Sequence, residues 1–274
     1  MTKRIITGLI AGAVAITITY FRNVAGGVLF YGGIYILYMI SLNEMLQALQ
    51  ARGLKPARWP IYLTGALLMP AYLWRGAQGL LIIYCLGAVL AMCSAVFIRD
   101  PREGDMVATA FPLVYPTLPF LAFFMIAALD EPFKLSLFLT VVISSIASDI
   151  FALVFGLLFG KHKLLPSVSP KKTWEGAVGG FVMSIVTMTV FGLIIGAYRD
   201  DSLWIWHYIV LGAIGSVTTQ LGDLVASAIK RYCGVKDFGK FFPGHGGVLD
   251  RLDGILFNAV FLYMYSLLVI GGLR

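Results

Sequence analysis

Charged residues are scarce in this chain of 274 residues, where they make up 13% of the sequence against 59% hydrophobic residues. Soluble globular domains carry about 25% charged residues. The apolar residues also come in runs of about 17 to 25, the length that crosses a bilayer as a helix. This composition excludes water as the main solvent and predicts an integral membrane protein.

Cysteine is also rare, and no internal repeat or low-complexity tract is present. Cys85 and Cys93 fall inside one apolar run and Cys233 in a polar segment, so the three thiols predict neither a disulfide framework nor a zinc site. Nothing resembles a nucleic-acid-binding module, and no nucleic-acid partner is expected. A net charge of +7 favours anionic lipid head groups and phosphate-bearing substrates instead.

The apolar runs predict an all-α fold, a polytopic membrane helix bundle of about nine transmembrane helices in a single domain. The predicted spans are 5–21, 24–40, 61–74, 80–98, 107–129, 135–159, 174–198, 203–229 and 255–270. The span at 61–74 is short and contains Pro70, and the span at 107–129 contains three prolines. Both are predicted to be kinked, re-entrant or interfacial.

The distribution of basic residues predicts the orientation, because loops rich in Lys and Arg stay in the cytoplasm. With nine spans, 16 of the 21 lysines and arginines fall on the side of the N-terminus. The N-terminus is therefore predicted to be cytoplasmic. Residues 1–130 are read as generic spans, a lipid-groove or dimer scaffold, and residues 131–274 as the catalytic helices and cytoplasmic loops.

Two carboxylates lie inside predicted spans, Asp149 within 135–159 and Asp223 within 203–229. An ionisable group at mid-bilayer costs about 2.5 to 3.5 kcal/mol by insertion scales, so such residues usually have a function. A structural carboxylate bonded to a neighbouring helix is the alternative, and Asp149 stays open between the two. Ser227 and Lys230 follow Asp223 on the same helical face.

The loop between the spans at 135–159 and 174–198 reads Lys161-His-Lys-Leu-Leu-Pro-Ser-Val-Ser169-Pro-Lys171-Lys172-Thr173-Trp-Glu-Gly176. Ser169 followed by Pro170 predicts a helix N-cap. Backbone N–H groups there, with two lysines and two hydroxyls, form a candidate anion site, and a basic membrane anchor is the alternative. Gly176, Gly179 and Gly180 are interpreted as close helix packing.

The segment from Lys230 to Asp253 is unusually polar and rich in glycine. Gly246 and Gly247 would let the backbone approach a phosphate, and Asp250 and Asp253 would face one way if the last helix begins nearby. Mg²⁺ binds through one or two carboxylates and substrate phosphates. We therefore predict that Asp223, Asp250 and Asp253 hold Mg²⁺ against a nucleoside triphosphate.

Three motifs carry a resemblance to a known family: Ser227-Ala-Ile-Lys230-Arg231, Lys236-Asp-Phe-Gly239, and Pro243-Gly-His245-Gly246-Gly247-Val-Leu-Asp250-Arg251-Leu-Asp253. Together they resemble the signature of the bacterial phosphatidate cytidylyltransferases, the CDP-diacylglycerol synthases. The segments Ser169 to Gly176 and Gly222-Asp223-Leu224 also look like family motifs, so the resemblance covers about the last 130 residues. One departure is that Ile150-Phe-Ala-Leu153 follows Asp149, where the family usually has a small polar residue, a glycine and Ala-Tyr.

The resemblance implies an enzyme of phospholipid synthesis in the bacterial inner membrane, with its active site facing the cytoplasm. CTP and phosphatidate would give CDP-diacylglycerol and pyrophosphate with Mg²⁺, a second cation such as K⁺, and a homodimer of subunits surrounded by membrane lipids. The predicted catalytic residues are Asp223, Lys230, Arg231, His245 and Asp250. Predicted substrate-binding residues are Ser169, Lys171, Lys172, Thr173, Ser227, Lys236, Gly246, Gly247 and Arg251. The metal ligands are Asp223, Asp250 and Asp253, with Asp149 left open.

Two alternatives to this function remain at the level of the sequence. One is a transporter of an anionic metabolite, in which Asp149 and Asp223 would bind coupling ions. The other is a CTP-dependent enzyme that acts on a different lipid phosphate. The products distinguish them, because a cytidylyltransferase releases pyrophosphate, a kinase releases CDP, and a transporter makes neither.

Overall fold

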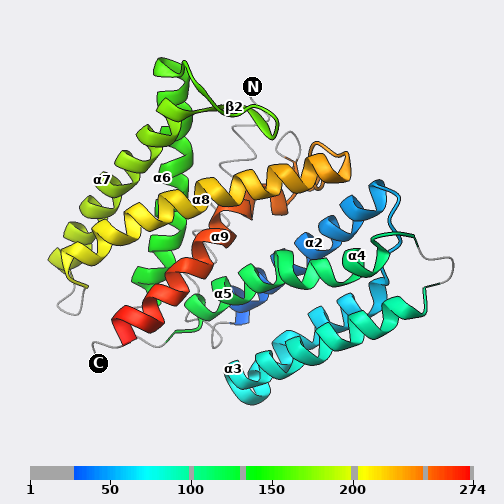
Figure 1. Ribbon diagram of the computed structural model, residues 1–274. Coiled ribbons are helices and arrows are strands. Elements are labelled where there is room, and N and C mark those ends of the chain that lie inside the picture. The colour runs from blue at the N-terminus through cyan, green and yellow to red at the C-terminus, as the bar shows by residue number, and fades with distance from the viewer. Residues whose placement is uncertain (1–27, 99–101, 130–133, 199–202, 243–245, 272–274) are drawn as a thin grey trace. The chain divides into compact units, whose positions relative to one another are not determined.

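The computed structural model describes residues 28–98, 102–129, 134–198, 203–242 and 246–271. Apart from one short hairpin, its regular structure is helical (Figure 1). The elements are α2 (Val28–Ala51), α3 (Arg58–Val96), α4 (Asp105–Pro112), the π-helix η2 (Leu113–Thr117), α5 (Leu118–Ala127), α6 (Lys134–Phe159), β1 (Lys163–Leu165), β2 (Ser169–Thr173), α7 (Trp174–Tyr198), α8 (Ile205–Cys233), α9 (Leu249–Tyr265) and the π-helix η3 (Ser266–Ile270). The predicted span at 5–21 lies outside the described residues.

Six helical segments of the described chain are long and apolar enough to cross a membrane. They are Arg58–Val96, Asp105–Ala127, Leu135–Phe159, Trp174–Tyr198, Ile205–Cys233 and Leu249–Ile270. The helical fold is thereby confirmed and these segments support a polytopic membrane protein, while the number of nine spans and the cytoplasmic N-terminus stay predictions.

The first of these segments, α3, folds back on itself. Arg75 and Gly76 leave the helical region, and the φ of 58° at Gly76 is one that residues with a Cβ rarely adopt. Two arms result, and a Cβ at Gly87 in the second arm would overlap the side chain of Thr64 in the first. The predicted spans 61–74 and 80–98 are therefore the two arms of one helical hairpin, drawn in cyan in Figure 1.

The segment from α4 to α5 is broken near its middle, as its prolines predicted. Tyr115 has an extended backbone, with φ −140° and ψ 116°, inside η2. Pro112 and Pro116 flank it, and neither can donate the backbone hydrogen bond that a continuous helix needs. Thr117 Oγ1 donates to the freed carbonyl of Pro112 at 2.8 Å, which satisfies one backbone group at the break.

The chain divides into two units. The first unit consists of Met1–Leu118 and Lys230–Arg251, and the second of Pro119–Ile229 and Leu252–Arg274. Each unit is described by itself below. The sequence division at residue 130 stays a prediction.

Glycine allows α6 and α7 to pack closely in the second unit. A Cβ at Gly180 would lie 2.7 Å from the backbone oxygen of Ser148, and a Cβ at Gly176 would lie 2.5 Å from that of Ala152. Gly179 faces the ring of Phe155 in the same way. The interpretation of these glycines as packing residues is confirmed, because backbones approach most closely where small residues line the contact.

A buried polar side chain joins three helices in the second unit. Asn258 of α9 donates from Nδ2 to Ser144 Oγ at 2.9 Å, Ser145 Oγ at 2.8 Å and the Val141 carbonyl at 3.0 Å, all on α6. Its Oδ1 accepts from Thr218 Oγ1 of α8 at 3.3 Å. Interhelical hydrogen bonds of this kind hold α6, α8 and α9 together where apolar burial supplies little attraction.

The hairpin of β1 and β2 corrects one prediction. Ser169 and Pro170 lie in β2, which pairs antiparallel with β1, and α7 begins only at Trp174. Thr173 supplies the cap instead, because its Oγ1 accepts the backbone N–H of Gly176 at 3.2 Å. The prediction of Ser169 as N-cap is therefore wrong by four residues.

Candidate active site

A cavity of about 230 Å³ lies in the second unit, bordered by α6, the hairpin, α7 and α8. It is lined by Asp149, Ala152, Leu153, Gly156, Leu164, Lys171, Lys172, Thr173, Gly176, Ala177, Gln220 and Asp223. The cavity therefore brings together five of the residues that the sequence singled out: Asp149, Lys171, Lys172, Thr173 and Asp223.

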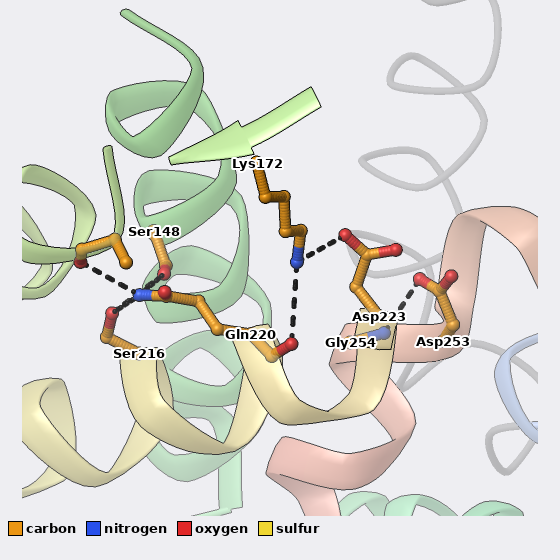
Figure 2. A network of polar contacts seen from close by, with 8 residues as sticks. Ser148, Lys172, Ser216, Gln220, Asp223, Asp253 and Gly254 are labelled. Atoms are coloured by element: carbon orange, nitrogen blue, oxygen red, sulfur yellow. Dashed lines mark hydrogen bonds and ion pairs between the residues drawn. The ribbon is translucent and has the colours of Figure 1, made fainter. Parts of the chain in front are cut away.

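Lys172 and Asp223 form an ion pair at this cavity. Lys172 Nζ lies 2.6 Å from Asp223 Oδ2 and donates to the backbone oxygen of Gln220 at 3.4 Å (Figure 2). The Gln220 side chain is held in turn by Ser216 Oγ at 3.0 Å and the Ala177 carbonyl at 3.1 Å. The lysine and aspartate side chains keep 23% and 33% of their exposure, so both stay accessible to a ligand.

Asp253 lies next to this pair, at the contact of α8 with α9. The residue is 8% exposed, and its Oδ1 accepts the backbone N–H of Gly254 at 2.8 Å. Gly222 permits the contact, because a Cβ there would lie 2.8 Å from the Asp253 backbone oxygen. Figure 2 shows the carboxylates of Asp223 and Asp253 next to each other, with Lys172 reaching Asp223 from β2.

The donor set at this point suits a hard cation. Carboxylate oxygens are the ligands that Mg²⁺ prefers, and it takes one or two of them besides phosphates. Across the described residues, no group of three or more His, Cys, Asp and Glu side chains is placed to hold a metal ion. Asp223 and Asp253, whose carboxylates lie next to each other, are two oxygen donors of the kind that Mg²⁺ accepts.

The other predicted residues of the hairpin differ in how far they are exposed. Lys171 is exposed and Ser169 half-buried, while Thr173 is buried at the start of α7. Glu175 was not singled out by its sequence, yet its carboxylate accepts the backbone N–H groups of Lys161 at 3.1 Å and His162 at 3.2 Å. It therefore fixes the chain that leads into the hairpin.

Asp250 is the centre of a second polar cluster, in the first unit. Its Oδ1 lies 2.8 Å from Lys230 Nζ, and its Oδ2 accepts the backbone N–H groups of Phe238 at 2.8 Å and Gly247 at 2.9 Å. Only 2% of the Asp250 side chain is exposed. Gly246 has a φ of 85°, a left-handed conformation that glycine adopts without strain. The carboxylate thus joins Phe238 and Gly247, which belong to two of the family motifs.

Glu44 of α2 was missed by the sequence reasoning and belongs to this cluster. It is 4% exposed, and its carboxylate accepts the backbone N–H groups of Val248 at 3.0 Å and Leu249 at 2.9 Å. Burial raises the pKa of the Glu44 carboxyl, the two amide donors oppose that rise, and the Asp250 carboxylate adds to it. A signal was present, because Glu44 is the only charged residue between Val28 and Ala51.

Those of the remaining predicted residues that the structure describes are not lining residues of the cavity. In the first unit Arg231, Lys236 and Arg251 are exposed, and Ser227 of α8 is half-buried in the second. His245 lies outside the described residues. The roles assigned to these residues stay predictions.

The helices and the cavity define a class of protein: a polytopic membrane protein whose site combines lysines with carboxylates, as sites that handle phosphates do. A sequence comparison narrows the class. The sequence model of the cytidylyltransferase family matches residues 2–269 of this chain. The chain therefore belongs to this family and is a nucleotidyltransferase. The family predicted from the motifs is confirmed.

Curated proteins named phosphatidate cytidylyltransferase are similar to this chain. One from Mycobacterium bovis is 33% identical over 240 residues, which cover 81% of this chain and 75% of that protein. Another from Brucella abortus is 32% identical over 269 residues, covering 97% and 93%. A third, from Staphylococcus saprophyticus, is 46% identical over 110 residues, covering 40% and 41%.

Proposed function

We propose that this cytidylyltransferase acts on phosphatidate, so that CTP and phosphatidate give CDP-diacylglycerol and pyrophosphate. The names of the similar proteins support this acceptor. Helices that cross a membrane suit a substrate whose acyl chains remain in the bilayer. The observation that carries the proposal is the cavity of the second unit. Lys172 of the basic hairpin strand β2 and Asp223 of helix α8 form an ion pair there.

The reaction needs positioning and charge neutralisation rather than a covalent enzyme intermediate. An oxygen of the lipid phosphate attacks the α-phosphorus of CTP, the bond between this phosphorus and the bridging oxygen to the β-phosphate breaks, and pyrophosphate leaves. Lys171 and Lys172 would neutralise the phosphates at the cavity, and the Thr173 hydroxyl would help to position them. Lys230, Arg231, Lys236 and Arg251 are further proposed phosphate contacts, with Ser169, Ser227, His245, Gly246 and Gly247 as positioning groups.

Asp223 and Asp253 are the carboxylates that we propose hold Mg²⁺. The ion, when bound, would withdraw negative charge from the phosphates of CTP. Lys172 would then balance the charge that remains, because its ammonium group already lies 2.6 Å from Asp223. We also propose that Asp250 is a metal ligand, as the sequence predicted, and that a second cation such as K⁺ takes part. Asp149 lines the same cavity, which favours a part in binding over a purely structural one.

The membrane placement is part of the proposal. Nine spans with a cytoplasmic N-terminus put 16 of the 21 basic residues on the side where CTP is found. We therefore place the enzyme in the bacterial inner membrane with its active site toward the cytoplasm. A homodimer is proposed from the family resemblance alone.

The test is incubation of the detergent-purified protein with labelled CTP, phosphatidate and Mg²⁺, followed by measurement of label in the lipid phase and of pyrophosphate. Equal amounts of the two products are expected, and chelation of Mg²⁺ should abolish both. Asp223→Asn should lower the rate at least about 100-fold if its charge holds the metal. Glu103→Gln, which changes an exposed acid that is not a lining residue of the cavity, serves as the matched control.

The products separate this function from its alternatives. Release of CDP with phosphorylated lipid would identify a kinase, and label transferred only to another lipid phosphate would change the acceptor. If the wild type makes no labelled lipid with any lipid phosphate, the proposed function is wrong, and uptake into liposomes becomes the assay.

A further inference from the structure

Glu44 is the only charged residue of α2, and the reaction described above does not use it. Its side chain lies inside the first unit rather than at a surface, with 4% of the residue exposed. A carboxylate in such surroundings lowers stability unless its oxygens are paired. The contacts of Glu44 therefore decide what it does.

Both oxygens of Glu44 are used at the start of α9. Oε1 accepts the backbone N–H of Val248 and Oε2 that of Leu249, at 3.0 and 2.9 Å. The first N–H groups of a helix have no partner within the helix and are normally satisfied by a Ser, Thr, Asp or Asn side chain at the cap. Val248 at that position has no polar side chain, and a carboxylate from α2 accepts the N–H groups of Val248 itself and of the first helical residue, Leu249.

The Glu44 carboxyl group lies so close to Gly239 and Gly247 that neither position has room for a side chain. A Cβ at Gly239 or at Gly247 would collide with the Glu44 carboxyl group. The backbone N–H of Gly247 points to Asp250 Oδ2 at 2.9 Å, one residue before the N–H that Glu44 accepts. The turn from Gly247 to Leu249 is therefore held from both sides by carboxylates.

Asp250 in turn holds Lys230, whose Nζ lies 2.8 Å from its Oδ1. A shift of the turn would move Asp250 and with it the lysine that the sequence assigns to phosphate. Misplacement by about 1 Å of a group that orients a reacting phosphate costs up to about 100-fold in rate. The path from Glu44 to the chemistry runs through contacts of the first unit alone.

We propose that Glu44 is a positioning residue of cytidylyl transfer, which holds the Gly247–Leu249 turn so that Asp250 and Lys230 keep their orientation. This inference rests on the proposed function, because Asp250 and Lys230 are assigned to the reaction there. It adds a residue from the first half of the chain to a site that the motifs place in the second half.

The test compares Glu44→Gln, Glu44→Asp and Glu44→Ala with Gln47→Ala, a change of an exposed residue on the same helix. Each variant is purified in detergent, its folded fraction is determined by size exclusion and thermal unfolding, and kcat and KM are measured per folded protein. Glu44→Gln keeps the shape but offers one of its two positions an amide N–H in place of an acceptor. We expect kcat to fall about 10-fold for Gln and about 100-fold for Ala, with KM for phosphatidate within twofold of the wild type.

A purely structural role predicts another pattern. The folded fraction or the unfolding temperature would fall while kcat per folded protein matched that of Gln47→Ala, and this result would overturn the proposal. A change confined to KM would overturn it as well. If Glu44→Ala does not fold, the Gln and Asp variants decide the question, and a wild type without activity refutes the proposed function and not this contact.

Discussion

Replacement of Lys172 by Met should damage catalysis much more than stability. The ion pair of Lys172 with Asp223 is partly exposed, with 23% and 33% of the side chains accessible. Pairs of this kind contribute about 0 to 1 kcal/mol to folding. Loss of the ammonium group should therefore leave the unfolding temperature within a few degrees of the wild type.

The same ammonium group is worth more against a phosphate in the cavity. A hydrogen bond to a charged group contributes about 1.5 to 3 kcal/mol, and each 1.36 kcal/mol is a factor of about ten in rate. The expected loss in kcat/KM for CTP is therefore about 10- to 150-fold. Lys172→Arg, which keeps the charge on a larger planar group, should fall between the wild type and the Met variant.

Steady-state kinetics with labelled CTP, together with thermal unfolding in detergent, check this expectation. Lys163→Met is the control, because Lys163 is an exposed lysine of β1 in the same hairpin and is not a lining residue of the cavity. Unchanged kcat/KM in Lys172→Met would refute the reasoning. So would a loss of activity that merely follows a loss of folded protein.

Two further predictions concern stability, and both are measured by thermal unfolding in detergent. Thr173→Val should lower the free energy of unfolding by about 0.5 to 2 kcal/mol, because it removes the cap of α7, whereas Ser169→Ala should change it little; the opposite ranking would restore the cap predicted from the sequence. Asn258→Leu should cost about 1 to 2 kcal/mol, because several interhelical hydrogen bonds are lost together. An unchanged unfolding temperature would mean that this asparagine does not hold its three helices.

Much of the architecture could be predicted from the sequence, because the membrane makes length and apolarity sufficient signals. The spans at 135–159 and 174–198 coincide with helical segments of the structure, and the predicted spans at 61–74 and 80–98 are the two arms of α3. The cap of α7 was misplaced because Ser169-Pro170 and Thr173 both carry cap signals. Pairing of β2 with β1 decided between them, and propensity does not report that pairing.

The candidate site was predictable where its residues lie in motifs. Lys172 and Asp223 were both singled out, but their contact was not, because they lie 51 positions apart in the sequence and no helical period relates them. Glu44 was missed because its contacts lie even further apart in the sequence. Its partners lie 204 and 205 residues further along the chain, so no local pattern could connect them.

The distance along the chain between Glu44 and its partners also bears on how the enzyme is made. At about 5 to 20 residues per second, a ribosome needs roughly 10 to 40 s to proceed from α2 to the start of α9. Throughout that interval the Glu44 carboxyl group must stay hydrated or protonated, because the amides that will bind it do not yet exist. The turn from Gly247 to Leu249 can bind Glu44 only after the start of α9 has been synthesised. Nascent chains in the membrane therefore lack this contact until translation is nearly complete.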